Sequence, residues 1–85
     1  MSVRPNPAGT IAEVLLRSQE KGWYTIAVHD VYGRCLAREQ KNMAAFADQT
    51  IAFDVSAFAE GAYTISVLGP FAHLSVPLMV YRGGH

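Results

Sequence analysis

Trp23-Tyr24-Thr25-Ile26-Ala27-Val28-His29-Asp30 is the segment that indicates the fold class most clearly. It is rich in aromatic and β-branched residues, and its side chains alternate, with Tyr24, Ile26 and Val28 on one side. Successive side chains of a β-strand point to opposite faces of the sheet, so this alternation is typical of a strand with one buried face. The sequence therefore predicts a strand over residues 23–30.

The residues after this strand predict a tight turn. The segment Asp30-Val31-Tyr32-Gly33-Arg34 begins with an Asp, whose carboxylate can accept backbone N–H groups two residues on. It also contains a Gly, which can adopt a positive φ. We expect a hairpin here, with a return strand over residues 34–40. Residues 41–48 are interpreted as a loop or a ragged edge strand.

The same alternation recurs along the rest of the chain. It predicts strands over residues 10–17, 49–55 and 62–68, and closing segments over 71–75 and 76–81. Pro77 favours an edge position for the last strand, because proline cannot donate to a strand ladder. Ser56 can cap one helical turn, so a brief helical crossover is expected over 56–60. With no long amphipathic helix and no internal repeat, the sequence predicts an all-β, immunoglobulin-like β-sandwich of about seven short antiparallel strands.

The chain is long enough for one small domain. Its 85 residues can bury a single thin core. Residues 1–9 contain two prolines and a glycine and are expected to form an extended lead, residues 10–82 the sandwich, and residues 83–85 a fraying tail. The predicted core consists of inward-facing strand residues: Tyr24, Ile26, Val28, Ile51, Phe53, Tyr63, Ile65 and Val67.

Composition excludes several functional classes. Hydrophobic residues make up 51% of the chain and charged residues 16%, which is too apolar for an intrinsically disordered protein. The formal net charge is zero, which argues against a nucleic-acid partner. No apolar run is long enough to insert stably in a membrane as a helix. The single cysteine, Cys35, cannot form an internal disulfide and is interpreted as a small buried hydrophobe.

No residue constellation in the sequence supports catalysis, a metal or a cofactor. His29, His73 and His85 lack a second ligand at metal-binding spacing. No serine lies in a Gly-x-Ser-x-Gly setting, and Asp54 is interpreted as a cap at a strand end. The sequence therefore predicts a non-enzymatic domain that acts through its surface. Its first residues lack the apolar core of a signal peptide, so we expect either a cytosolic protein or a piece of a longer precursor.

The order of the motifs resembles a known family. Arg4-Pro5-Asn6-Pro7 is followed by the segment 24–34, which ends in Asp-x-x-Gly-Arg, and by the segment 51–67, which contains Asp-Val-Ser and Gly-x-Tyr. An apolar strand and Arg82 close the chain. This succession is similar to the C-terminal sorting domain of the type IX secretion system of Bacteroidetes, over residues 4–82. Two features depart from the family pattern: the last strand lacks lysines, and three residues follow Arg82.

The resemblance implies an immunoglobulin-like fold and a role as an address label. The cargo would lie N-terminal to the domain in a precursor whose signal peptide is at the far end. After transit through the periplasm, the outer-membrane translocon would recognise the domain, and a sortase-like peptidase would remove it, which leaves the cargo secreted or at the cell surface. The signal-motif residues carried over are Pro5, Asn6, Pro7, Asp30, Gly33, Arg34, Gly61, Tyr63, Val80 and Arg82.

Among these residues, the exposed terminal strand and Arg82 are the better candidates for translocon contact, because an unpaired sheet edge invites strand addition. The same edge could also join two copies of the domain as a dimer. Asp30, Gly33, Gly61 and Tyr63 are expected to have structural roles in turns and the core.

Two other functions compete with the sorting signal. The aromatic residues Trp23, Tyr24, Tyr32 and Phe71 could form a fibronectin-like carbohydrate- or protein-binding module appended to a secreted enzyme. A structural spacer domain is the third possibility. The three hypotheses share the same fold and differ in which surface is used.

Overall fold

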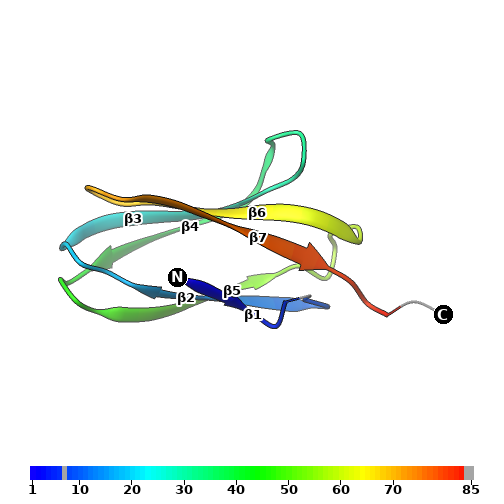
Figure 1. The fold of residues 1–85 in the computed structure, drawn as a ribbon, viewed down its shortest axis with the longest axis horizontal. Coiled ribbons are helices and arrows are strands. Elements are labelled where there is room, and N and C mark those ends of the chain that lie inside the picture. The colour runs from blue at the N-terminus through cyan, green and yellow to red at the C-terminus, as the bar shows by residue number, and fades with distance from the viewer. Residues whose placement is uncertain (7, 84–85) are drawn as a thin grey trace.

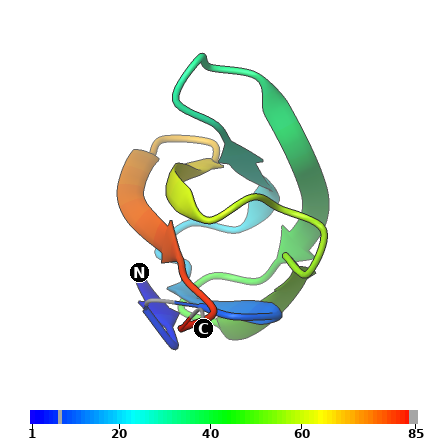
Figure 2. The same ribbon diagram turned by 90° about the vertical axis from the view of Figure 1, so that its right-hand side faces the viewer.

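The chain folds into two stacked antiparallel sheets, as shown by a computed structural model that describes residues 1–6 and 8–83 (Figure 1). The strands are β1 (Ser2–Arg4), β2 (Ile11–Arg17), β3 (Gly22–His29), β4 (Cys35–Met43), β5 (Asp48–Asp54), β6 (Gly61–Leu68) and β7 (His73–Val80). One sheet has the order β1-β2-β5 and the other β4-β3-β6-β7. Seen end-on, the second sheet lies over the first with β7 above β1 (Figure 2). The predicted immunoglobulin-like β-sandwich is confirmed.

The core lies between the two sheets and is built from the alternating residues that the sequence indicates. Ile26, Val28, Ile65 and Val67, from the two central strands of the larger sheet, are fully buried. Of the predicted core residues, only Tyr63 is half-buried, and it packs against the core from its edge. The core also includes residues that the prediction left out: Ala8, Ala12, Val14, Leu16, Met43, Val55, Leu78 and Val80.

Several element predictions are wrong in detail. The stretch predicted as an extended lead contains β1, which pairs with β2 through the register Val3↔Val14. The return strand continues to Met43. The side chain of Met43 is buried in the core, and this burial stabilises the last residues of the strand. Residues 56–60 form turns and a bend rather than a helical crossover. The two closing segments are one continuous strand, β7, which pairs with β6 along its whole length.

Cys35 is exposed, so its interpretation as a buried hydrophobe is also wrong. It lies at the start of β4, directly after the turn, where the register with β3 shifts between Val28 and His29. Such an irregularity bends and twists the strand locally, and the hairpin between β3 and β4 projects away from the two sheets (Figure 1). Position in the sheet, rather than residue type, sets the exposure of Cys35.

The two central strands share a repeated heptapeptide, so the expectation that the chain holds no internal repeat is wrong. Residues 22–28 read Gly-Trp-Tyr-Thr-Ile-Ala-Val and residues 61–67 read Gly-Ala-Tyr-Thr-Ile-Ser-Val. Their sixth residues, Ala27 and Ser66, face each other in the antiparallel pairing of β3 with β6. The two copies are therefore related by a local two-fold axis through this pair. Each copy is only seven residues long, well below the roughly 20–50 residues of the repeats that build solenoids and propellers.

The repeat produces the same local structure twice. Each copy starts with a Gly at positive φ, 142° at Gly22 and 148° at Gly61. In each copy the Tyr hydroxyl donates a 2.6 Å hydrogen bond to the carbonyl four residues before it, from Tyr24 to Glu20 and from Tyr63 to Ala59. This geometry is the tyrosine corner of immunoglobulin-like domains. It fixes the chain where it enters each central strand.

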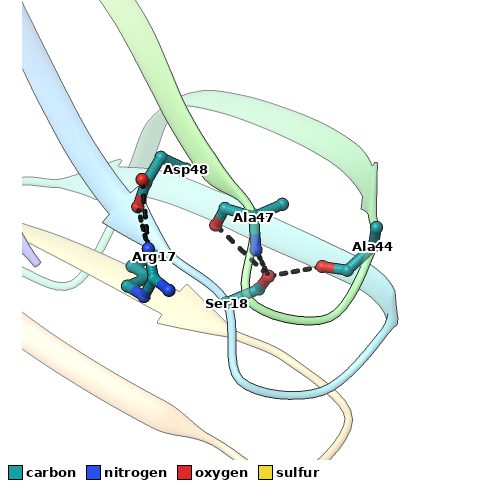
Figure 3. Close-up of polar contacts among 5 residues, drawn as sticks. All are labelled: Arg17, Ser18, Ala44, Ala47 and Asp48. Atoms are coloured by element: carbon teal, nitrogen blue, oxygen red, sulfur yellow. Dashed lines mark hydrogen bonds and ion pairs between the residues drawn. The ribbon is translucent and has the colours of Figure 1, made fainter.

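The end of the sandwich that holds the first tyrosine corner is closed by Ser18, the one buried polar residue among those described. Its Oγ donates to the carbonyl of Ala44 at 2.5 Å and accepts from the N–H of Ala47 at 3.0 Å (Figure 3). The turn that it holds contains Phe46, which adopts a φ of 55°. Beside it, Arg17 and Asp48 form an exposed ion pair with an N–O distance of 3.1 Å. Ser18 thus ties the chain after β2 to the turn between β4 and β5.

Candidate functional site

The motif residues gather at the other end of the sandwich, in the right-hand half of Figure 1. This end is where β3 turns into β4, where β5 leads into β6, and where β7 finishes. Three pieces of chain meet there: the hairpin turn 30–34, the corner 55–63, and the lead together with the last residues of β7. We refer to this region as the motif end.

The hairpin turn is organised by Asp30. Its Oδ1 accepts the N–H groups of Tyr32 and Arg34, both at 2.9 Å, and its Oδ2 accepts the Arg34 Nε at 2.6 Å. Gly33, at a φ of 82°, donates its N–H to the Asp30 carbonyl. The Arg34 guanidinium also lies 5.5 Å from the ring centroid of the exposed Tyr32. The Asp-x-x-Gly-Arg motif is therefore a self-contained turn, as the sequence predicts.

The charge of Asp30 is stabilised by this arrangement. Partial burial raises the pKa of the Asp30 carboxyl, but the hydrogen bonds from Arg34 and Tyr32 and the charge of Arg34 outweigh it, so the pKa lies below its ordinary value. A similar turn ends β5, where the hydroxyl and N–H of Ser56 donate to Asp54 and lower its pKa. The interpretation of Asp54 as a cap is confirmed.

The corner between β5 and β6 is held by Tyr63. Its ring packs against Phe58 at a centroid distance of 5.4 Å, and its hydroxyl reaches back to Ala59 as described above. Gly61 occupies the positive-φ position that lets the chain turn into β6, with open space where a side chain would project. The Gly-x-Tyr motif is thus the second tyrosine corner.

Arg82 ties the end of the chain to this corner. Its Nη2 donates to the carbonyls of Val55 at 2.6 Å and Ser56 at 3.0 Å. Its own N–H donates to a carboxylate oxygen of Glu60 at 2.8 Å. Val80, two residues earlier, is fully buried in the core. Both residues of the terminal motif therefore make intramolecular contacts.

The lead runs along the second half of β7 and completes its edge. The N–H of Ala8 donates to Met79 and the carbonyl of Ala8 accepts from Tyr81, which forms a short parallel bridge. The side-chain amide of Asn6 donates to the Pro77 carbonyl at 3.2 Å and accepts the Met79 N–H at 3.0 Å. We call this set of contacts the lead clasp. Pro5 is exposed beside Tyr81 and Arg82, and Pro7 lies outside the described residues.

An open hollow of about 530 Å³ separates the hairpin turn from the corner. Most of its apolar surface comes from Tyr32, Leu36, Phe58 and Tyr63, and its charged groups are Asp30, Arg34 and Glu60. Arg34 is paired with Asp30, and Glu60 with the main chain of Arg82. The charged groups of the hollow are thus engaged within the domain itself.

The aromatic residues of the competing binding-module hypothesis do not form one surface. Tyr24 is buried, and Tyr32 lies on the turn at the motif end. Trp23 and Phe71, which are exposed, lie at the opposite end of β3 and β6. A sugar-stacking platform needs such rings side by side, and the structure separates Tyr32 from Trp23 and Phe71.

The described residues also carry few features of a chemical site. Within 1–6 and 8–83, no three His, Cys, Asp or Glu side chains lie close enough together to hold a metal ion. The same part of the chain forms no helix of the length and hydropathy needed to cross a membrane.

The fold and the motif end define an immunoglobulin-like β domain whose sequence motifs are all used to fix its own turns and edges. A family model described as the secretion system C-terminal sorting domain matches residues 2–70, and the chain belongs to this family. The domain is thus a C-terminal sorting signal for type IX secretion and not itself a catalyst. No curated protein matches the chain.

Family membership sets the broad setting in which the domain acts. It works with the type IX secretion system on a cargo N-terminal to it, which implies a secreted or cell-surface protein. The match ends at Pro70, so β7 and Arg82 lie beyond the matched residues.

Sequence reasoning named the motif residues but missed most of their partners. Ala8 bonds to β7 through its main-chain N–H and C=O groups, which no sequence pattern marks. Glu60 and Ser18 bond through their side chains but belong to no recognisable motif. One available signal was the heptapeptide repeat, which would have predicted two tyrosine corners instead of one.

Proposed function

We propose that the outer-membrane translocon recognises this domain in the periplasm as a folded body, chiefly through its terminal strand β7 and Arg82. A sortase-like peptidase then cuts on the N-terminal side, and the cargo remains outside the cell or at its surface. The proposal deepens the sorting role that the family defines.

The lead clasp is the observation that carries this proposal. Asn6 and Ala8 are hydrogen-bonded to the second half of β7, so the segment next to the cargo and the terminal strand form one unit. Arg82 adds the corner 55–60 to the same unit. A receptor that contacts β7 would therefore bind only when the whole domain, including its first residues, has folded.

The position of β1 supports a cleavage point before Ser2. Residues 2–4 pair with β2, and a peptidase needs its substrate as a free extended chain. A cut within residues 2–8 would require β1 or the lead clasp to separate from the sandwich. We therefore place the division between linker and domain at the start of β1, with Pro5 and Asn6 inside the domain.

A reporter fusion tests the proposal. The chain is fused behind a reporter that carries a signal peptide, and export is measured in a bacterium with an active type IX system. We expect the fused reporter in the medium or on the cell surface, and retention in the periplasm when Val80→Asp places a charge in the core. Leu36→Asp, at an exposed position of β4, is the matched control and should be exported.

Retention of the parent fusion would overturn the sorting of this chain as proposed. Recognition of a folded body would be overturned if the Val80→Asp fusion is exported at the level of the parent fusion although circular dichroism shows that its domain is unfolded.

A further inference from the structure

The edge of β7 is open along its first half. Met79 and Tyr81 bond to the lead, so the odd-numbered residues of β7 direct their main-chain groups away from β6. By the same alternation the main-chain N–H and C=O groups of His73 and Ser75 face away from β6. These groups have no main-chain partner among the described residues. The lead clasp covers the strand only from Pro77 onward.

The other exposed edges carry charges that discourage pairing. Arg38, Glu39 and Lys41 lie on β4, and Asp48 and Asp54 on β5. Charged side chains on edge strands are a common protection against unwanted strand addition. Residues 73–80 of β7 contain no Asp, Glu, Lys or Arg. The open half of β7 is thus an uncharged edge, and an uncharged segment suits it best.

A mostly apolar pocket lies beside this open half-edge. Its volume is about 260 Å³; Leu16, Tyr24, Val67, Phe71 and Leu74 supply most of its apolar lining, and Arg17, Gln19 and Glu20 supply its polar lining. Leu74 belongs to the open half of β7 and is 46% exposed, while Phe71 is 87% exposed. A strand added to β7 would lie about 4.8 Å beyond it and would direct alternate side chains toward the layer in which Leu74 lies. One of these side chains could enter the pocket.

We propose that this half-edge and pocket form the docking site for an extended segment of the secretion apparatus. The segment adds as a strand beside His73 and Ser75, is uncharged, and inserts an apolar side chain between Leu16 and Leu74. Main-chain hydrogen bonds supply affinity and the pocket supplies specificity, as in other strand-addition complexes. The inference rests on the proposed function, because it names how β7 is recognised.

A proline at position 75 tests the main-chain part of the site. Ser75→Pro removes an outward N–H but none of the bonds to β6, and Pro77 already occupies an equivalent outward position. Ser75→Ala keeps the N–H and is the matched control. In the reporter assay we expect export to fall about tenfold for Ser75→Pro, which corresponds to about 1.4 kcal/mol of binding, and to stay at the parental level for Ser75→Ala. Thermal unfolding of the purified domain verifies that both variants fold.

A charge in the pocket tests the side-chain part independently. Leu74→Arg and Leu36→Arg place the same charge at positions of similar exposure, 46% and 41%, on opposite edges of the larger sheet. We expect only Leu74→Arg to reduce export. The inference is overturned if folded Ser75→Pro and Leu74→Arg fusions are exported like the parent while the parent fusion leaves the cell, and this result leaves the sorting function standing.

The occupant is tested with the purified domain. If β7 receives a segment of the apparatus, the amides of His73 and Ser75 should exchange with solvent much faster than those of Met79 and Tyr81 at every protein concentration. Protection of His73 and Ser75 that grows with concentration, together with sedimentation as a dimer, would assign the edge to a second copy of this chain and overturn the proposal.

Discussion

Asn6 lies beside Met79 as a strand residue would, except that it uses its side chain. Its Oδ1 accepts the Met79 N–H at 3.0 Å, and its Nδ2 donates to the Pro77 carbonyl at 3.2 Å. A primary amide has the same donor and acceptor as a peptide group, so it can satisfy two outward groups of an edge strand at once. The relationship gives the Asn of the Pro-Asn-Pro segment a defined structural role.

Replacing Asn6 should therefore loosen the lead. For Asn6→Ala we expect a loss of about 1 kcal/mol in the free energy of unfolding, because two exposed hydrogen bonds are removed. Amide exchange at Met79 should accelerate as well. Urea unfolding measures the first effect and hydrogen exchange the second. Asn42→Ala, on the exposed face of β4, is the control and should change neither. Unchanged exchange at Met79 would contradict the role assigned to the amide.

The two copies of the heptapeptide allow a matched test of glycine. Gly22→Ala and Gly61→Ala each place a side chain at a positive φ, which costs about 1–3 kcal/mol. At Gly22 the added Cβ would also lie 2.7 Å from Pro70 Cγ, whereas at Gly61 it meets open space. We expect Gly22→Ala to be the more destabilising by about 1–3 kcal/mol, because overpacking adds to the strain. Chemical denaturation compares them, and equal losses would contradict the assigned packing.

Ser18→Ala should open the end of the sandwich that lies away from the motif end. The substitution leaves the Ala47 N–H and the Ala44 carbonyl without their side-chain partner, in a position where Ser18 is 1% exposed. An unsatisfied buried polar group costs about 1–3 kcal/mol. The expected loss in unfolding free energy is in that range. Ser75→Ala, at an exposed serine, is the control. A loss equal to that of the control would show that water replaces the Ser18 hydroxyl without cost.

The local patterns of the sequence were sufficient to predict the strands of the core. Alternation over 23–30 and 62–68 is a property of neighbouring residues, and the turn at Asp30 closes within five residues. The contacts of the motif end are different in kind. Asn6 meets Pro77 and Arg82 meets Val55 only because seven strands stack in a particular order. The alternation of side chains along a strand contains no information on hydrogen bonds between residues so far apart in the sequence. The lead clasp could therefore not be predicted.

The hairpin turn should make stability depend on pH. The pKa of Asp30 is lower in the folded domain than the ordinary value of 3.8, so its stabilising effect is complete above that value and is lost as the pH falls through the folded pKa. We expect the unfolding free energy to decrease below about pH 4. Asp30→Asn should lower stability at pH 7 and flatten this decrease. Urea midpoints at pH 7, 5 and 3 provide the measurement, and identical slopes in both proteins would contradict the assignment.

Arg82 offers the test that separates a structural tie from a recognition contact. Its guanidinium Nη2 bonds to two adjacent carbonyls, whereas a lysine carries its ammonium one bond closer to the backbone and holds its hydration water more strongly. We expect Arg82→Lys to lower the unfolding free energy by about 1–2 kcal/mol, whereas Arg38→Lys, on an exposed edge, should have no measurable effect. Because Arg82 is also proposed to contact the translocon, export of the reporter fusion should fall more than this loss of stability explains. Export that follows stability alone would leave Arg82 as a structural tie only. If Arg82→Lys leaves stability intact but abolishes export, the side chain contacts the translocon directly and its bonds to Val55 and Ser56 contribute little to the fold.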